Sequence, residues 1–322
     1  MKDIKNILVT GAVGQIGSEL TMALRERYGA ERVIATGRKT EPSKELKESG
    51  PFHFIDVNSV DSVEEMIKKY DIDTIVHMAA ILSAVGEKNP TLAWDVNMNG
   101  TLNILNLGVK YEMARVIIPS SIAVWGPGTP AVAPQDTALH PTTMYGVTKV
   151  CGEILADYYV KKYNLDSRGL RYPGIISSET LPGGGTTDYA VAIYYEAVKN
   201  RSYTCFVRED TRLPMMYMPD CLKATIDLME APFEKLKRHN DYNVGSMSFT
   251  VKDLADSIKK VMPDFTVAYE PDFRQAIADS WPDAVDDAAA REDWGWNPSF
   301  DLDSMTRDML EKLQARHAKG LL

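Results

Sequence analysis

ILVTGAVGQIG, at residues 7–17, is the most informative stretch of this 322-residue sequence. Its first four residues form an apolar run with the length of a buried strand, and the residues that follow carry apolar side chains at helical spacing. Three glycines, Gly11, Gly14 and Gly17, lie where one pattern gives way to the other. A strand, a glycine-rich turn and a helix in this order predict a site for the phosphates of a dinucleotide.

Each of the three glycines has its own physical reason. Gly11 permits the tight turn, Gly14 lets the backbone approach a pyrophosphate, and Gly17 allows the helix to pack closely on the strand. The N-terminus of the helix adds free N–H groups and a positive dipole. A turn without a ligand is the alternative, which the strand–turn–helix context disfavours. The residues expected to hold the cofactor here are Gly11, Val13, Gly14, Gln15, Ile16 and Gly17.

The rest of the chain continues the alternation of strands and helices. Further strands are predicted at residues 33–36, 52–56, 74–78, 116–118 and 167–172. Helices are predicted from Asp61, with Glu64 completing a cap, and at 143–162, 187–199, 218–230, 250–261 and 302–315. This order predicts an α/β fold with a Rossmann-type doubly wound parallel sheet. We expect a dinucleotide-binding domain at 1–172, returning at about 215–245, and a smaller, discontinuous C-terminal substrate domain mainly at 173–322.

The composition of the sequence argues against several classes of binding partner. The net charge of −9 disfavours nucleic acid, because an acidic chain repels polyphosphate. The three cysteines and five histidines show no metal-ligand spacing, so no metal site is expected. No apolar stretch is long enough to span a membrane, and the first strand leaves no room for a signal peptide. A cytoplasmic protein that acts on a small molecule is therefore expected.

The adenosine end of the cofactor site has an unusual residue. An acidic residue commonly ends the second strand and accepts hydrogen bonds from the ribose hydroxyls, whereas this sequence has Gly37 there. Arg38 or Lys39 could instead meet a 2′-phosphate, or be solvated surface charges. Asp56 and Val57, after the third strand, suit the adenine ring. We therefore expect NAD, with NADP as an open alternative because of Gly37.

A second motif supplies the chemistry. Tyr145 and Lys149 lie four residues apart in the helix predicted at 143–162, so both side chains share one face. A tyrosine that acts as a base at neutral pH needs its pKa lowered by about three units. A lysine ammonium and an oxidised nicotinamide ring both act in that direction. Ser121, at the end of the fifth strand, could hydrogen-bond the reacting oxygen, although a serine there could also be a turn cap.

Two more segments are expected beside the cofactor. Met78, Ala79 and Ala80 end the fourth strand, and the two alanines leave room for the dinucleotide. Asn97 lies on a predicted helix, where it would relay a proton, buttress Lys149, or simply pack as a buried amide.

Together these motifs resemble the extended short-chain dehydrogenase/reductase superfamily over nearly the whole chain. A closer resemblance is to the epimerase-like L-threonine 3-dehydrogenases. Four stretches carry it: AILSA at 80–84, RYPGIIS at 171–177, GTTDYA at 185–190 and LPMMYMPD at 213–220. The resemblance implies oxidation of L-threonine with Ser121, Tyr145 and Lys149 as the catalytic set. It further implies that substrate contacts Leu82, Ser83, Ser121, Tyr145, Gly185, Thr186, Thr187 and Trp281, and that Tyr172, Gly174 and Ile175 contact the cofactor.

The sequence also bears on the alternatives. Nucleotide-sugar epimerases that resemble this fold carry an RDYIHVxD stretch whose arginine binds a diphosphate. If Asp220 matches the last residue of that stretch, this chain has Leu213 in place of the arginine, which favours a compact substrate. A nucleotide-sugar epimerase or reductase and a non-catalytic cofactor sensor remain alternatives, and other β-hydroxy amino acids remain alternative substrates. The resemblance implies a homodimer that pairs through helices within 90–111 and 143–163.

Overall fold

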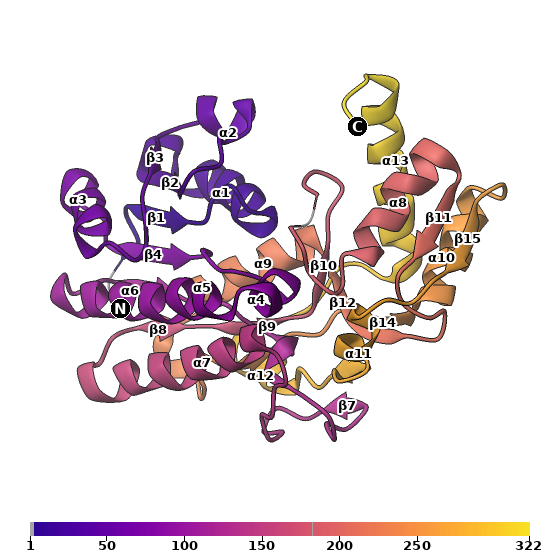
Figure 1. Cartoon of the computed structure of the whole chain (residues 1–322). Helices are drawn as coiled ribbons and strands as arrows, with labels where there is room; N and C mark the ends of the chain where they lie inside the picture. Colours follow the sequence, from indigo (N-terminus) through magenta and orange to yellow (C-terminus); the bar gives the residue numbers. More distant parts are fainter. Residues whose placement is uncertain (1–2, 182) are drawn as a thin grey trace.

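A parallel six-stranded sheet forms the larger half of the molecule (Figure 1). The computed structural model describes residues 3–181 and 183–322. The strands, in sheet order, are β3 (Phe52–Phe54), β2 (Val33–Gly37), β1 (Ile7–Thr10), β4 (Thr74–His77), β5 (Arg115–Ile117) and β8 (Ser167–Arg168). The order reverses between β1 and β4, and at this point such sheets bind dinucleotides. The predicted fold class is confirmed.

Helices cover both faces of this sheet. Leu8 packs into a core shared with α3 (Val60–Tyr70), α6 (Gly100–Lys110) and α7 (Met144–Tyr163). Ile7 and Val9 face the other way, into a core with α1 (Gln15–Tyr28) and α9 (Met218–Glu230). Successive residues of β1 thus bury opposite sides, which explains why its sequence is apolar throughout instead of alternating.

Around the third strand, the structure differs from the prediction. The third strand ends at Phe54 and not at Asp56. Helix α3 begins earlier than predicted, because Ser59 caps it by accepting a hydrogen bond from Ser62 N at 3.3 Å. Glu64 forms no cap and instead pairs with Lys68.

The strand predicted at 167–172 is divided at Gly169. Residues before it complete the large sheet as β8, whereas β9 (Leu170–Tyr172) lies between β6 (Ser120–Ser121) and β13 (Tyr242–Asn243) in a separate sheet. A Cβ at Gly169 would lie 2.4 Å from the carbonyl oxygen of Ile118. Only glycine allows the backbone to pass so close at this switch between sheets.

The remaining elements build the second half of the molecule. One sheet combines β10 (Gly174–Ile176), β12 (Arg212–Tyr217) and β14 (Met247–Thr250), and a pair combines β11 (Ser202–Cys205) with β15 (Thr266–Tyr269). A separate apolar core joins these strands to α8 (Tyr189–Asn200), α10 (Val251–Val261) and α13 (Leu302–Ala318). Short elements complete the chain: α2 (Lys44–Glu48), α4 (Ser83–Lys88), α5 (Pro90–Trp94), β7 (Val132–Ala133), α11 (Arg274–Ala278), β16 (Ala284–Val285) and α12 (Ala288–Trp294). No helix within the described ranges is long and apolar enough to cross a membrane.

Two glycines give opposite predictions for stability. A Cβ at Gly17 would lie 2.2 Å from the Gly11 carbonyl oxygen, so Gly17→Ala should cost about 1–3 kcal/mol through overpacking. Gly152, inside α7, has no atom within 4 Å of such a Cβ, and Gly152→Ala should add about 0.5–1 kcal/mol by favouring the helix. Thermal unfolding of both variants beside the parent checks this. A Gly17→Ala protein as stable as the parent would contradict the close packing of α1 on the turn.

Candidate active site

The proposed catalytic residues come from two segments that pack directly on each other. Ser121 ends β6, and Tyr145 and Lys149 lie in the first two turns of α7. Thr143 caps α7 by accepting a hydrogen bond from Gly146 N at 3.0 Å. A Cβ at Gly146 would lie 2.1 Å from the Ala123 carbonyl oxygen, so glycine lets the helix start against the strand end that carries Ser121.

The three side chains lie close together, but Lys149 lines a separate small cavity and not the cleft that Ser121 and Tyr145 share, where the sequence predicted both Tyr145 and Lys149. Ser121 and Tyr145 line the same cleft, and the Ser121 hydroxyl is close enough to act on the pKa of the Tyr145 phenol. The Lys149 ammonium lies 5.6 Å from the centre of the Tyr145 ring and donates a hydrogen bond to the Pro119 carbonyl at 2.7 Å. A substrate oxygen that contacts both hydroxyls would therefore also lie close to a fixed cation.

The electrostatics differ from the prediction in one respect. We expected Lys149 to keep Tyr145 ionised, but burial raises the pKa of Tyr145 to about 12, and the Ser121 hydroxyl only partly opposes this rise. Burial also lowers the pKa of Lys149 to about 8, although the Glu153 carboxylate acts against the decrease. Desolvation therefore outweighs attraction within the pair. The phenolate needs a further positive charge, which an oxidised nicotinamide would bring.

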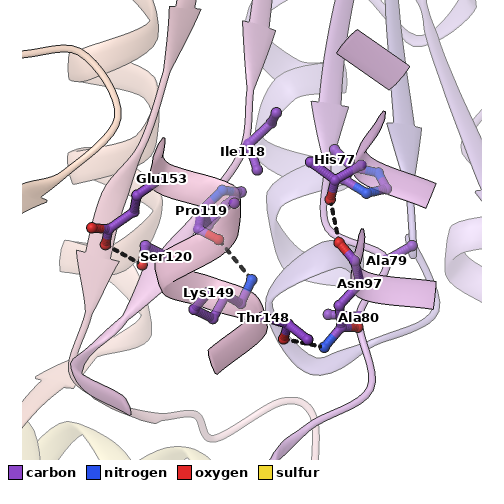
Figure 2. A pocket seen from close by; sticks show the side chains of 12 residues that line it. His77, Ala79, Ala80, Asn97, Ile118, Pro119, Ser120, Thr148, Lys149 and Glu153 are labelled. Atoms are coloured by element: carbon purple, nitrogen blue, oxygen red, sulfur yellow. Dashed lines mark hydrogen bonds between the residues drawn. The ribbon is translucent and has the colours of Figure 1, made fainter. Parts of the chain in front are cut away.

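A small cavity of about 20 Å³ lies behind Lys149, and Figure 2 shows the side chains that line it. His77 is among them; its Nδ1 is 2.8 Å from Thr10 Oγ1, while its buried Nε2 has no hydrogen-bond partner among the described residues. This volume is close to the minimum for one water molecule, roughly 10–15 Å³. A water there would contact polar atoms on the side of Lys149 opposite the substrate cleft.

A buried ionic network forms the far wall of that cavity. Glu153 lies one helical turn after Lys149, accepts a hydrogen bond from Ser120 Oγ at 2.5 Å and pairs with Arg171 at 2.8 Å. Figure 2 shows Glu153 directed toward Ser120 and Lys149 directed toward Pro119. The residues next to each catalytic group are thus themselves fixed by hydrogen bonds.

Asn97 acts on the neighbouring backbone. It lies in a π-helical turn, Asp95–Asn99, and its amide bonds both the N–H and the carbonyl of Ile81, at 2.8 and 3.0 Å. The same amide donates to Thr148 Oγ1 at 3.0 Å. These bonds tie the Ile81 segment to Thr148 and do not reach Lys149, so the three roles considered for Asn97 stay predictions.

The glycine turn fits the phosphates of a dinucleotide. Gly11 has φ +67°, and a Cβ there would lie 2.6 Å from the Ala79 backbone nitrogen, so β1 and the end of β4 touch at the turn. Helix α1 follows with Gly14 at its N-cap, no side-chain cap and no acidic residue in its first turn. Its first N–H groups are therefore left for an anion.

The other predicted cofactor residues extend from this turn along the carboxyl edge of the sheet. At one end, a Cβ on Gly37 would lie 3.1 Å from Val13, and Arg38 pairs with Asp56 at 3.0 Å. Val57 lies nearby, against Gly100 of α6. At the other end, the residues that share a cleft with Tyr145 are Gln15, Ile16, Tyr172, Gly174 and Ile175.

The predicted substrate residues all line that same cleft, which encloses about 120 Å³. They are Leu82, Ser83, Ser121, Tyr145, Gly185, Thr186, Thr187 and Trp281. The hydroxyl groups of Ser83 and Thr186 lie 3.3 Å apart across the cleft, and both side chains are buried. Leu213 is buried in β12, and Arg212 is directed away to Ser248 and Asp253.

Sequence reasoning missed four residues that line the cleft: Ser120, Ile122, Pro173 and Asp188. Asp188 is the one of them that can carry a charge. Its Oδ2 accepts hydrogen bonds from the backbone N–H groups of Gly184, at 3.0 Å, and Gly185, at 2.8 Å. Burial raises the pKa of Asp188, and these two bonds oppose the rise. Its position directly after the glycine–threonine stretch and before α8 was the available signal, but an Asp there also suits a helix cap.

The fold and this arrangement agree with comparisons to known proteins. The model of the NAD dependent epimerase/dehydratase family matches residues 7–245, and the chain belongs to that family. Its class is that of a nicotinamide-dependent oxidoreductase of the extended short-chain type.

Individual relatives are similar over nearly the whole chain. An uncharacterized epimerase/dehydratase of Staphylococcus aureus is 46% identical, over 97% of this chain and 98% of its own. The solved L-threonine dehydrogenase from Clostridium difficile is 51% identical with a TM-score of 0.95, covering 98% of this chain and 99% of its own. That from Phytophthora infestans is 51% identical with a TM-score of 0.92, covering 97% of this chain and 100% of its own.

The ionisation of Tyr145 is directly measurable. In the cofactor-free protein its phenol should stay protonated until about pH 12, because burial disfavours the anion. The ultraviolet difference between the parent and Tyr145→Phe, followed over a pH titration, isolates this one phenol. Saturating NAD should move the transition to lower pH. A transition near neutrality without cofactor would show that Lys149 alone ionises the phenol.

Proposed function

We propose that the protein oxidises the β-hydroxyl of L-threonine to 2-amino-3-oxobutyrate, a step of threonine breakdown, with NAD as hydride acceptor. The observation that carries the proposal is a cleft of about 120 Å³ that places Ser121 and Tyr145 opposite hydroxyl groups and one carboxylate. The similarity to two L-threonine dehydrogenases at 51% identity supports the same substrate.

The chemistry divides among the three catalytic residues. Tyr145, as phenolate, removes the proton of the β-hydroxyl, and the β-carbon gives up its hydrogen with both electrons as a C=O bond forms. Ser121 hydrogen-bonds the same oxygen throughout. Lys149 holds positive charge beside the phenolate. The nicotinamide, when bound, supplies the hydride acceptor and an additional positive charge.

The walls of the cleft suit a zwitterion. Ser83, Thr186 and Thr187 offer hydroxyl donors to a carboxylate, and Asp188 offers an acceptor to an ammonium group. An ammonium group beside Asp188 would in turn favour its ionised form. A diphosphate would meet Asp188 without the arginine that nucleotide-sugar enzymes provide, since Leu213 occupies that position. The cleft thus favours an amino acid over a nucleotide sugar.

Tyr145→Phe should abolish oxidation of L-threonine while leaving cofactor binding largely intact, because the variant loses only the phenolic base. Absorbance of reduced cofactor measures turnover, and quenching of intrinsic fluorescence measures binding. UDP-glucose and UDP-galactose assayed in parallel test the epimerase alternative. L-serine and 3-hydroxynorvaline test the range of β-hydroxy amino acids. Retained turnover would refute the role of Tyr145, and no turnover of any alcohol by the parent would favour a cofactor sensor.

Asp188→Asn should reduce kcat/KM for L-threonine by about 10- to 100-fold, because the buried ammonium loses its counter-charge. Asparagine can still accept hydrogen bonds from Gly184 and Gly185. The kcat/KM for 3-hydroxybutyrate, which lacks the ammonium group, should decrease much less in this variant. Asp264→Asn is the matched control, since it removes an exposed carboxylate outside the cleft and should leave kcat/KM for both substrates unchanged. An equal loss with both substrates would assign Asp188 to the loop structure alone.

The protein is further proposed to form a homodimer through α5, α6 and α7. Trp94, Leu102, Ile154 and Tyr158 on these helices are exposed, with Ile154 65% accessible. Exposed apolar side chains on adjacent helices are typical of a subunit interface. One L-threonine 3-dehydrogenase that is 47% identical to this chain is named as monomeric, so the dimer is proposed from the exposed apolar residues and not from the relatives.

Analytical ultracentrifugation tests the dimer. The parent should sediment as a dimer, and Ile154→Asp as a monomer, because an unpaired carboxylate would be buried in the contact. Phe273→Asp, at an exposed apolar residue far from these helices in sequence, serves as control and should remain dimeric. A monomeric parent would contradict the proposal.

A further inference from the structure

The adenosine end of the cofactor site lacks the carboxylate that usually excludes a 2′-phosphate. Strand β2 ends at Gly37, where an acidic side chain would accept hydrogen bonds from the ribose hydroxyls and repel a phosphate. A Cβ at Gly37 would lie 3.1 Å from Val13 Cγ1 and 3.3 Å from Phe52 Cζ. These two side chains fill the place of the missing one, so the wall beside the ribose is neutral at this point.

Asp56 does not replace the missing carboxylate. Its Oδ1 accepts a hydrogen bond from Asn58 N at 3.0 Å, and its Oδ2 lies 3.0 Å from Arg38 Nε. Both oxygens are therefore engaged by the protein, and the negative charge is matched by the guanidinium beside it. The nearest acidic group thus leaves little charge to repel a phosphate.

Arg38 is held in a geometry that suits an anion. Its Nε faces Asp56, which restricts the side chain, while no described residue accepts a hydrogen bond from its two terminal nitrogens. Lys39 follows it, is exposed and forms no ion pair among the residues that the structure describes. Two adjacent cations on a chain of net charge −9 therefore lie next to the predicted ribose position. A planar guanidinium with free terminal nitrogens is a strong phosphate ligand.

We propose that Arg38, oriented by Asp56, binds the 2′-phosphate of NADP together with Lys39, so that the protein accepts NADP as well as NAD. The proposal rests on the cofactor part of the proposed function and is independent of the amino acid that is oxidised. Three features each favour binding of a 2′-phosphate: the neutral end of β2, the engaged Asp56 and the free guanidinium nitrogens.

Calorimetry with two cofactor fragments tests this without any turnover. Adenosine 2′,5′-bisphosphate and 5′-AMP differ only in the 2′-phosphate. The full-length parent at low salt should bind the bisphosphate at least about tenfold more tightly, as expected for charge-assisted hydrogen bonds to a phosphate. In the Arg38→Gln, Lys39→Gln double variant, the affinity ratio should fall to near one. In the parent, the ratio of the two affinities should also decrease as the salt concentration increases.

Lys47→Gln is the matched control, because it removes a cation from α2, on the same half of the molecule, and should leave the ratio unchanged. Equal or weaker binding of the bisphosphate by the parent would overturn the proposal. So would a ratio that survives in the double variant, or the absence of binding by either fragment. If L-threonine is not oxidised but the ratio behaves as expected, only the substrate assignment fails.

Discussion

The site depends on the desolvation of one tyrosine–lysine pair. Gly146 lets α7 start in contact with the end of β6, and this contact brings the half-buried side chains of Tyr145 and Lys149 beside Ser121. Burial opposes charge on both groups, raising the pKa of the phenol and lowering the pKa of the amine. The protein therefore holds a base that is poorly ionised until a positive ring lies beside it. Such coupling suits an oxidation, because more of the phenol is ionised when the hydride acceptor is in place.

The surroundings of the pair restrict its motion. Lys149 bonds the Pro119 carbonyl, and Glu153, one turn on, is held by Ser120 and Arg171. Asn97 fixes the opposite side through Ile81 and Thr148. These hydrogen bonds hold the strand end and the helix together, and the bond to Pro119 restrains the Lys149 side chain beside Tyr145.

Much of the fold and the site could be predicted from the sequence, because periodicity and spacing are local. The three glycines of the turn, the strand–helix alternation and the four-residue separation of Tyr145 and Lys149 each specify geometry within a few residues. The division at Gly169 could not be seen, because it depends on a contact with Ile118, more than fifty residues earlier. The direction of the Tyr145 pKa shift could not be predicted, because it depends on burial by segments distant in the sequence. Asp188 was missed because an aspartate before a helix is explained equally well as a helix cap. The two-domain division and the roles of the site residues remain predictions.

The candidate site combines residues from two parts of the chain. Ser121, Tyr145 and Lys149 belong to the parallel-sheet half, whereas Thr186, Thr187 and Asp188 belong to one loop ahead of α8. A UDP-glucose 4-epimerase from Thermotoga maritima shares the fold at 21% identity and a TM-score of 0.84. The loop ahead of α8 lies outside the strands of the parallel sheet, so changes in it would leave the packing of that sheet intact.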